Sequence, residues 1–170
     1  MAKLSMTLET RRLILRHLNE SDATFLNALY NTDGFLTFVG DKNIRSDIDA
    51  AVYLRSTLLP MYKQDYMGLM AVEEKGSGKA IGICGLIKRD TLDDIDLGYG
   101  FFPAFQRQGY AKEAAEAVIQ LARETLAVPQ IVAITHPTNN RSISLLEKLA
   151  FKVQSQGIDD PELILLKLTF

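Results

Sequence analysis

The amino-acid sequence predicts a mixed α/β fold in which a mostly antiparallel central sheet of about six to seven strands is flanked by helices. Short apolar runs alternate with longer segments of helical spacing along the whole chain. Neither an internal repeat nor a segment of biased composition divides the chain. With 170 residues, of which 47% are hydrophobic, the chain can bury one substantial core, and we expect a single domain over residues 1–170.

The N-terminal part is expected to form one strand followed by two helices. The run RRLILRHL, residues 11–18, alternates as a strand does, and the next segment, 19–31, begins with Asn19, a good helix-capping residue. A second helix is expected over residues 46–64, where Pro60 ends or kinks it. Its apolar face is expected to contain Ile48, Ala51, Val52, Leu54, Leu58 and Leu59.

Three antiparallel strands are expected next, because the turn compositions KGSG and TLDD separate three apolar runs. These strands cover residues 66–74, 79–90 and 93–102. From Gly109 the spacing becomes helical, with small and apolar residues on one face, and Pro129 follows the end of this helix. A short buried strand, an amphipathic helix and a closing strand are then expected at residues 130–135, 139–151 and 161–170.

Composition excludes several classes of function. The 19 basic and 21 acidic residues give a net charge of -2, so no overall positive field would hold the protein on nucleic acid or on an anionic membrane. No apolar stretch approaches the roughly 20 residues of a membrane span, and the N-terminus lacks the apolar core of a signal peptide. The single cysteine, Cys84, cannot form an internal disulfide. We therefore expect a cytoplasmic protein with no nucleic-acid partner, no membrane partner and no metal site.

The segment FFPAFQRQGYAKEA joins a strand to a helix through a polar turn, residues 106–111, that we call the elbow. The first N–H groups of a helix have no intrahelical partner and carry the positive end of its dipole, which suits an anion. Gly109 and the small Ala111 leave the backbone accessible, while Arg107 and Lys112 add positive charge. Neither the P-loop pattern nor the three-glycine dinucleotide pattern fits here. On the elbow alone, Gly109 could equally serve only to ease the turn into the helix.

The order of these motifs resembles the GNAT superfamily of acyl-CoA-dependent N-acetyltransferases. Gln106, Gly109 and Ala111 match that family's pyrophosphate loop, Gln/Arg-x-x-Gly-x-Gly/Ala. The segments ETRRLILRHLNESDA, IDLGYGFFP and NNRSISLLEKLAF are similar to the branch that acetylates the N-termini of ribosomal proteins. The match spans residues 10–151, which is most of the chain.

The resemblance implies a sheet that splays beyond Phe101 and Phe102, where the pantetheine arm of the co-substrate acetyl-CoA would pair with freed backbone groups like an added strand. The elbow would then hold the pyrophosphate. The implied cofactor-binding residues are Phe101, Phe102, Gln106, Arg107, Gln108, Gly109, Tyr110, Ala111, Lys112, Asn139 and Ser142. The expected reaction is acetyl transfer to a primary amine, with the N-terminal α-amine of a ribosomal protein or peptide as the favoured acceptor, by a monomer or homodimer.

Acetyl transfer to an amine requires a stabilised oxyanion and a base, among other groups. A backbone N–H near Phe102 is the expected oxyanion donor. Asp96 lies where similar enzymes often carry a glutamate base, although it could simply be a solvated carboxylate. A second acidic cluster before the last strand is either an alternative base or an ordinary acidic turn, and it consists of Asp159, Asp160 and Glu162.

The leaving thiolate also requires a proton. Ser142 aligns with the family's serine that is proposed to protonate it, although Ser142 could instead be a first-turn residue satisfied by the backbone. Two departures from the family pattern follow, because Leu146 stands where many relatives carry a tyrosine acid and Ala150 replaces a glycine. Asn139 resembles the asparagine that binds the pantetheine arm and is also a good helix N-cap. Cys84 is expected to pack in the core.

The acceptor side is expected near the two N-terminal helices, where aromatic and methionine side chains gather. Most are expected in the core, and those that face the cleft would form a groove for a peptide or a small apolar amine. These residues are Tyr30, Phe35, Phe38, Tyr53, Met61, Tyr62 and Tyr66. His136 could relay a proton, although a loop histidine is usually hydrated. Two alternatives stay open, namely a non-catalytic acyl-CoA-binding module and an acetyltransferase for small-molecule amines.

Overall fold

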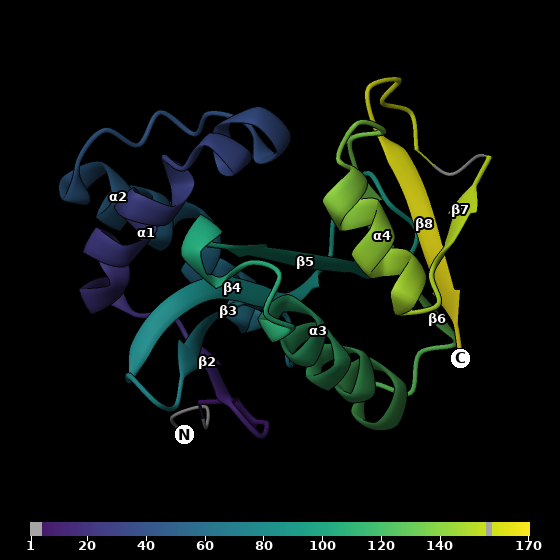
Figure 1. Ribbon diagram of the computed structural model, residues 1–170, viewed down its shortest axis with the longest axis horizontal. Coiled ribbons are helices and arrows are strands. Elements are labelled where there is room, and N and C mark those ends of the chain that lie inside the picture. The colour runs from purple at the N-terminus through teal and green to yellow at the C-terminus, as the bar shows by residue number, and fades with distance from the viewer. Residues whose placement is uncertain (1–4, 156–157) are drawn as a thin grey trace.

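The computed structural model describes residues 5–155 and 158–170, and it confirms the mixed α/β class (Figure 1). One sheet of eight strands runs in the order β1-β2-β3-β4-β5-β6-β8-β7, and among these pairs only β5–β6 is parallel. The strands are β1 (Thr7–Glu9), β2 (Leu13–His17), β3 (Gly68–Glu74), β4 (Lys79–Ile87), β5 (Asp96–Phe101), β6 (Gln130–Thr135), β7 (Lys152–Gln154) and β8 (Ile164–Thr169). The short strands β1 and β7 were not predicted, because three residues show no readable alternation.

Four α-helices cover the sheet, namely α1 (Ala23–Tyr30), α2 (Asp47–Tyr53), α3 (Tyr110–Gln120) and α4 (Asn140–Lys148). Helix α2 continues through a π-helical turn and then a 3-10 turn that contains Pro60, and this confirms the expected change at the proline. Asn19 caps the turn before α1 as predicted, since its side chain accepts a hydrogen bond from the Ser21 N–H at 2.9 Å. Among the described residues, no helix has both the length and the apolar character needed to cross a membrane.

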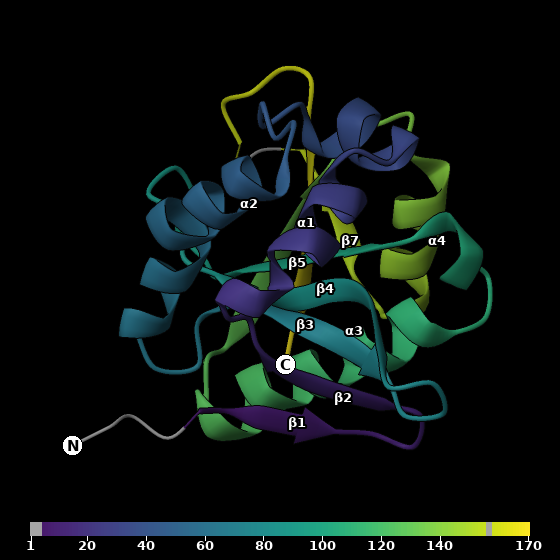
Figure 2. The same cartoon turned by 90° about the vertical axis from the view of Figure 1, so that its left-hand side faces the viewer.

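The helices pack on opposite faces of the sheet (Figure 2). On one face, Ala115 and Val118 of α3 and Leu146 of α4 share an apolar cluster with strand residues such as Leu15. On the other face, α1 and α2 pack against β3 and β4 in a second cluster. The sheet is therefore the middle of three layers, with α3 and α4 on one face and α1 and α2 on the other.

Helix α2 buries a narrower face than the sequence predicted. Leu54 and Leu58 are buried together with Ala50, and these three residues form one row at a spacing of four. Ile48 and Val52, which were expected on the same face, are 77% and 52% exposed. The correction follows from helix geometry, because residues four apart line up along the axis and Ile48 and Val52 form a separate row that points to solvent.

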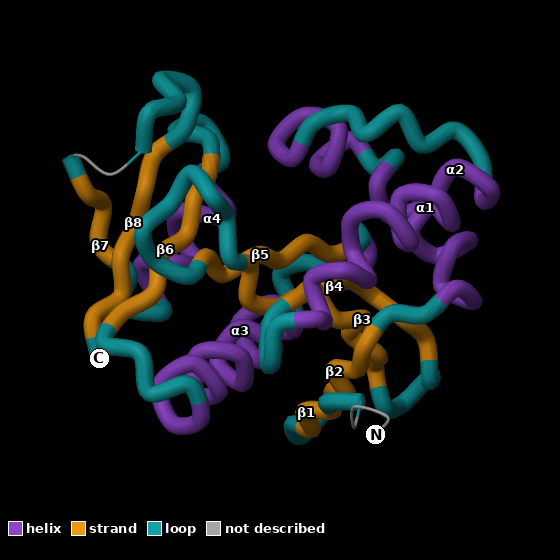
Figure 3. Tube along the Cα trace, turned by 180° about the vertical axis from the view of Figure 1, so that it is seen from behind, coloured by secondary structure: helices purple, strands orange, loops and turns teal. Residues whose placement is uncertain are grey.

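Strands β5 and β6 separate almost as soon as they meet (Figure 3). Their only paired position in the described sheet is Asp96 with Val132, where the Val132 N–H donates to the Ile95 carbonyl at 2.9 Å. Strand β6 instead pairs with β8 over its whole length and follows that strand away from β5. The splay implied by the family resemblance is thus present, but it opens directly after Asp96 rather than beyond Phe101.

The corrected face of α2 can be tested by a matched pair of truncations. Leu54→Ala removes a fully buried side chain and should lower the free energy of unfolding by about 2–5 kcal/mol. Ile48→Ala shortens an exposed side chain of the same helix and should change it by less than about 0.5 kcal/mol. Urea unfolding followed by circular dichroism measures both free energies. Equal losses in the two variants would mean that Ile48 is buried as the sequence predicted.

Candidate active site

The elbow has a backbone conformation that is unusual outside glycine. After β5, a 3-10 turn at Pro103–Phe105 leads into the elbow, where Arg107 and Gly109 both have positive φ, at 61° and 82°. Gly109 is the residue directly before α3. A left-handed residue costs a non-glycine side chain on the order of 1–2 kcal/mol, so the surrounding contacts must stabilise Arg107.

Two glutamine side chains provide such contacts. The amide of Gln106 donates to the Phe101 carbonyl at 3.0 Å, and the amide of Gln108 donates to the Ala104 carbonyl at 2.7 Å. Both glutamines were expected to bind the cofactor. Their side chains instead hold the turn, which leaves the backbone to face a ligand.

Arg12, a residue that the sequence analysis did not select, holds the elbow from the far end of the chain. Its guanidinium donates to the Gln108 carbonyl at 3.0 Å and forms an ion pair with Glu113 at 2.7 Å. It also lies over the Tyr110 ring, 4.3 Å from the centroid. The partial negative charge of the Gln108 carbonyl is therefore neutralised by Arg12. It would not repel an anion bound at the elbow. No local motif shows this, because about one hundred residues separate the partners.

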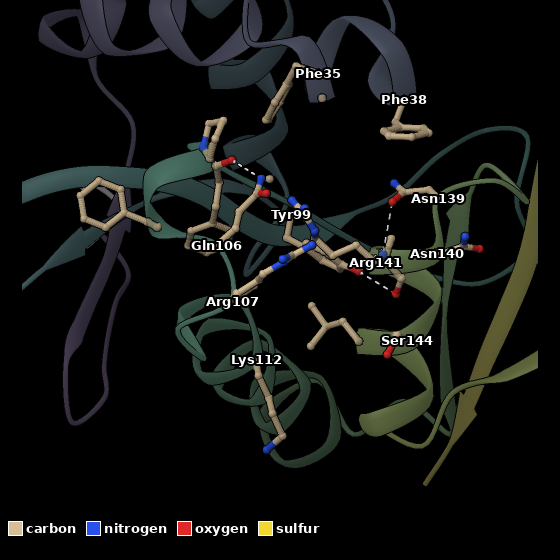
Figure 4. Close-up of a pocket in the computed structure, with 18 of the residues that line it drawn as sticks. Phe35, Phe38, Tyr99, Gln106, Arg107, Lys112, Asn139, Asn140, Arg141 and Ser144 are labelled. Atoms are coloured by element: carbon tan, nitrogen blue, oxygen red, sulfur yellow. Dashed lines mark hydrogen bonds between the residues drawn. The ribbon is translucent and has the colours of Figure 1, made fainter.

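A groove of about 950 Å³ runs from the elbow past β5 to the segment Phe35–Val39 (Figure 4). It is lined by most of the residues expected to bind the cofactor, namely Phe101, Gln106, Arg107, Gly109, Ala111, Lys112, Asn139 and Ser142. Phe102, Gln108 and Tyr110 are not among the lining residues. Arg141 and Lys148 of α4 add two further cations, and no described lining residue is acidic. The groove therefore favours an anionic ligand.

The start of α4 places one hydroxyl in the groove, where it pairs with a hydroxyl from β5. Asn139 caps the helix as predicted, since its side-chain oxygen accepts from the Ser142 N–H at 3.3 Å. The Ser142 hydroxyl lies 2.7 Å from the hydroxyl of Tyr99 on β5. Burial raises the pKa of Tyr99 to about 12. Tyr99 was missed by the sequence analysis, although it alternates with Leu97 and Phe101 on the face of β5 that packs under α3 and α4.

The backbone of β5 has its free edge toward the groove. An oxyanion donor was expected near Phe102, and it is not the N–H of Phe102 itself, because that group donates to the Ile81 carbonyl of β4 at 3.0 Å. Because the hydrogen-bonding edge alternates along a strand, the N–H groups of Tyr99 and Phe101 point the other way, into the gap left by β6. Of the two candidate oxyanion donors, the Phe101 N–H lies next to the expected position and the Tyr99 N–H lies three residues before it.

Asp96 stands where the gap begins, and it is buried rather than solvated. Its side chain is almost fully buried at 1% exposure, and one carboxylate oxygen accepts from Arg89 at 2.7 Å. The other oxygen makes no hydrogen bond of ordinary geometry among the described residues, although a longer contact with the backbone of Ile134 on β6 favours the charged form. Burial raises the pKa of Asp96, and the neighbouring Arg89 opposes this only in part. Asp96 does not line the groove.

The remaining candidates lie outside the groove. Asp159, Asp160 and Glu162 are exposed, and the Glu162 N–H donates to the Asp160 side chain at 2.9 Å within a turn. Cys84 is buried in the core as expected, and burial raises the pKa of its thiol. His136 lies next to the ring of Phe38, 6.1 Å between centroids.

Only two of the seven residues expected on the acceptor side line the groove. They are Phe35 and Phe38, which descend from the segment after α1 (Figure 4). A Cβ atom on Gly100 would lie 2.2 Å from the Phe35 ring, so Phe35 packs directly on the backbone of β5. The other five do not line it, and they are Tyr30, Tyr53, Met61, Tyr62 and Tyr66.

The splayed sheet, the elbow and the groove agree with a sequence comparison. A family model described as the acetyltransferase (GNAT) domain matches residues 12–152. The chain belongs to the GNAT acetyltransferase family. It is accordingly an acetyl-CoA-dependent N-acetyltransferase, which confirms the resemblance seen in the sequence.

Individual relatives and structures support the same family. YoaA of Bacillus subtilis, named as an uncharacterised N-acetyltransferase, is 29% identical over 152 residues that cover 89% of this chain and 84% of YoaA. An acetyltransferase structure from Agrobacterium tumefaciens has a TM-score of 0.84 at 25% identity, and the match covers 97% of this chain and 95% of that one. RimL, a ribosomal α-N-protein acetyltransferase in complex with coenzyme A, has a TM-score of 0.81 at 12% identity, with 97% and 98% covered. At that identity the likeness to RimL shows the fold alone.

The buried carboxyl of Asp96 predicts a pH-dependent effect on stability. Because its pKa is raised in the folded state, the folded protein holds this proton more tightly than the unfolded chain does, and stability falls as the pH rises through the raised value. Asp96→Asn removes that titration. As the pH is raised from 4 to 7, the wild type should therefore lose stability relative to the variant.

Urea unfolding at both pH values provides the measurement. Asp90→Asn, which changes an exposed carboxylate in the same connection between β4 and β5, controls for the loss of one negative charge. A stability difference that moved in the opposite direction with pH would contradict the buried, protonation-favouring environment of Asp96.

Proposed function

We propose that this GNAT enzyme transfers the acetyl group of acetyl-CoA to the α-amine of a protein or peptide N-terminus. The observation that carries the proposal is the open edge of β5. This edge, the elbow that follows β5 and the start of α4 line one continuous groove. A ligand with an extended arm and a diphosphate matches this shape, because the arm can pair with a free strand edge and the diphosphate can bind a helix N-terminus.

The cofactor contacts follow from that placement. The backbone N–H groups at the start of α3, from Gly109 to Ala111, would bind the diphosphate, with Arg107 and Lys112 beside them. The pantetheine arm would lie along β5, where the backbone groups of Tyr99 and Phe101 face the gap. The fit is supported by Gly109, since any side chain there would be strained at a φ of 82° and would approach Arg12 to 3.2 Å.

The chemistry then uses groups next to the thioester. An N–H of β5, from Tyr99 or Phe101, would stabilise the oxyanion, and Ser142 would donate a proton to the leaving thiolate. Asp96 is the notable carboxylate near the start of the gap, but it lies outside the groove and is held by Arg89, so it could accept a proton only through water. The acceptor would therefore have to lose its proton largely because of its own pKa.

That condition favours an α-amine. An α-amine with a pKa near 8 needs about 1.4 kcal/mol to lose its proton at pH 7, whereas a lysine with a pKa of about 10.4 needs about 4.6 kcal/mol. The two phenylalanines Phe35 and Phe38 offer the acceptor an apolar wall. A polycationic small molecule would call for carboxylates, and no described lining residue is acidic. The fold shared with the ribosomal α-N-protein acetyltransferase RimL agrees with a protein acceptor.

Placement of the diphosphate at the elbow predicts that Gly109→Glu weakens coenzyme A binding by about 100-fold or more, because a carboxylate would face the phosphates. Gly78→Glu is the matched control, since Gly78 also has positive φ, at 69°, but has open space around it and lies outside the groove. Both variants carry the same backbone strain. Calorimetric titration with coenzyme A separates them, and equal affinities would mean that the diphosphate binds elsewhere.

The acceptor is tested by thiol release from acetyl-CoA with a panel of amines. Peptides with a free N-terminus should be acetylated faster than the same peptides with a blocked N-terminus and an internal lysine, and faster than polyamines. The rate should rise with pH up to about 8, where the α-amine becomes neutral. A blocked lysine peptide that reacts as well as the free one would overturn the assignment of the acceptor, while leaving the cofactor site intact.

A further inference from the structure

The hydroxyl groups of Tyr99 and Ser142 lie 2.7 Å apart, although 43 residues separate them in the sequence. Tyr99 comes from β5 and Ser142 from the first turn of α4, so the contact crosses the opening of the splayed sheet. Both residues line the groove. At the position where many relatives have a tyrosine acid, this chain has Leu146, which is buried in the core and has no hydroxyl.

Two orientations of the protons are possible in this pair, and the surroundings favour one. If Ser142 donated to Tyr99, the phenolic proton would be left with the Ser142 carbonyl at 3.4 Å, which is a long contact for an O–H donor. If Tyr99 donates to Ser142, the short contact is made by the more acidic hydroxyl, and the serine proton is free to point elsewhere. Burial raises the pKa of Tyr99, so the phenol stays protonated and keeps this role at neutral pH.

We infer that Tyr99 is a positioning residue that donates to the Ser142 hydroxyl and thereby points the serine proton into the groove, toward the departing sulfur. The inference rests on the proposed function. In the step, the acceptor nitrogen forms a bond to the carbonyl carbon and the carbon–sulfur bond breaks, with its electron pair going to sulfur. The Ser142 proton passes to that sulfur, and the serine oxygen takes the proton that the nitrogen loses, directly or through water. One neutral amine and one thioester thus give one amide and one thiol.

A double-mutant cycle tests the direction of this coupling. Ser142→Ala should lower kcat by about 100-fold, and Tyr99→Phe by about 10-fold, with little change in the KM for acetyl-CoA. In the Ser142→Ala background, Tyr99→Phe should have no further effect on kcat, because the tyrosine acts through the serine. Ser77→Ala, in the turn between β3 and β4, is the serine control, since Ser77 bonds Glu74 outside the groove.

The leaving group provides a readout that a merely structural role would not change. With an acetyl thioester of a more acidic thiol, the departing sulfur needs less help from a proton, so the defect of Tyr99→Phe should shrink toward the wild-type rate. A defect of the same size with both thioesters would assign Tyr99 to packing and would overturn the inference.

Binding of the product supplies a measurement that does not depend on turnover. The pKa of the coenzyme A thiol bound in the groove, followed by the ultraviolet absorbance of the thiolate, should be lower in the wild type than in Tyr99→Phe, because the oriented serine stabilises the thiolate. Equal values in both proteins would count against the inference even if the wild type is active. If the wild type neither binds coenzyme A nor releases thiol with any peptide, the proposed function itself fails, and the two failures can be told apart.

Discussion

The structure depends on the loss of hydrogen bonding between β5 and β6 after their single paired position at Asp96 and Val132. Backbone N–H and carbonyl groups that are buried without a partner destabilise a fold, so a sheet does not open in its centre without a compensating arrangement. Here β6 keeps all six of its residues paired with β8. That pairing uses one edge of β6, so beyond Asp96 the facing edges of β5 and β6 both lack a strand partner, and the edge of β5 faces a groove instead of the core.

Charged and polar contacts hold the strands together where the opening begins. Asp96 is paired with Arg89, while Asp94 accepts from Gln130 at 3.1 Å and lies 3.8 Å from Lys167 of β8. These contacts join the connection between β4 and β5 to β5, β6 and β8 at the end of the sheet where the gap begins. Removing Asp96 from water is costly, and its raised pKa shows that the contacts with Arg89 and Ile134 do not offset the full cost. The buried pair of Asp96 and Arg89 is therefore better explained by its place at the start of the opening than by a contribution to stability.

Sequence reasoning identified the elements whose signal is local. Alternation located the long strands, and Asn19 and Asn139 were placed correctly as caps because a cap needs only the residues that follow it. The elbow was found for the same reason. The sequence could not identify Arg12 or Tyr99 as parts of the site, because each acts on a segment far away along the chain. The face of α2 was drawn too wide, since apolar composition alone does not say which of two rows packs on the sheet.

The contact between Tyr99 and Ser142 links the geometry of the fold to its chemistry. An opening between two strands needs something to fix its width, and here a hydrogen bond joins β5 to α4 across it. The hydroxyl that relatives place on α4 at the position of Leu146 would arise from the same helix as Ser142 and would leave β5 unconnected. With the phenol on β5, the strand that is proposed to bind the cofactor would also orient the proposed proton donor. A displacement of α4 away from β5 would break this contact, so in the proposed mechanism the position of α4 and the donation of the proton are coupled.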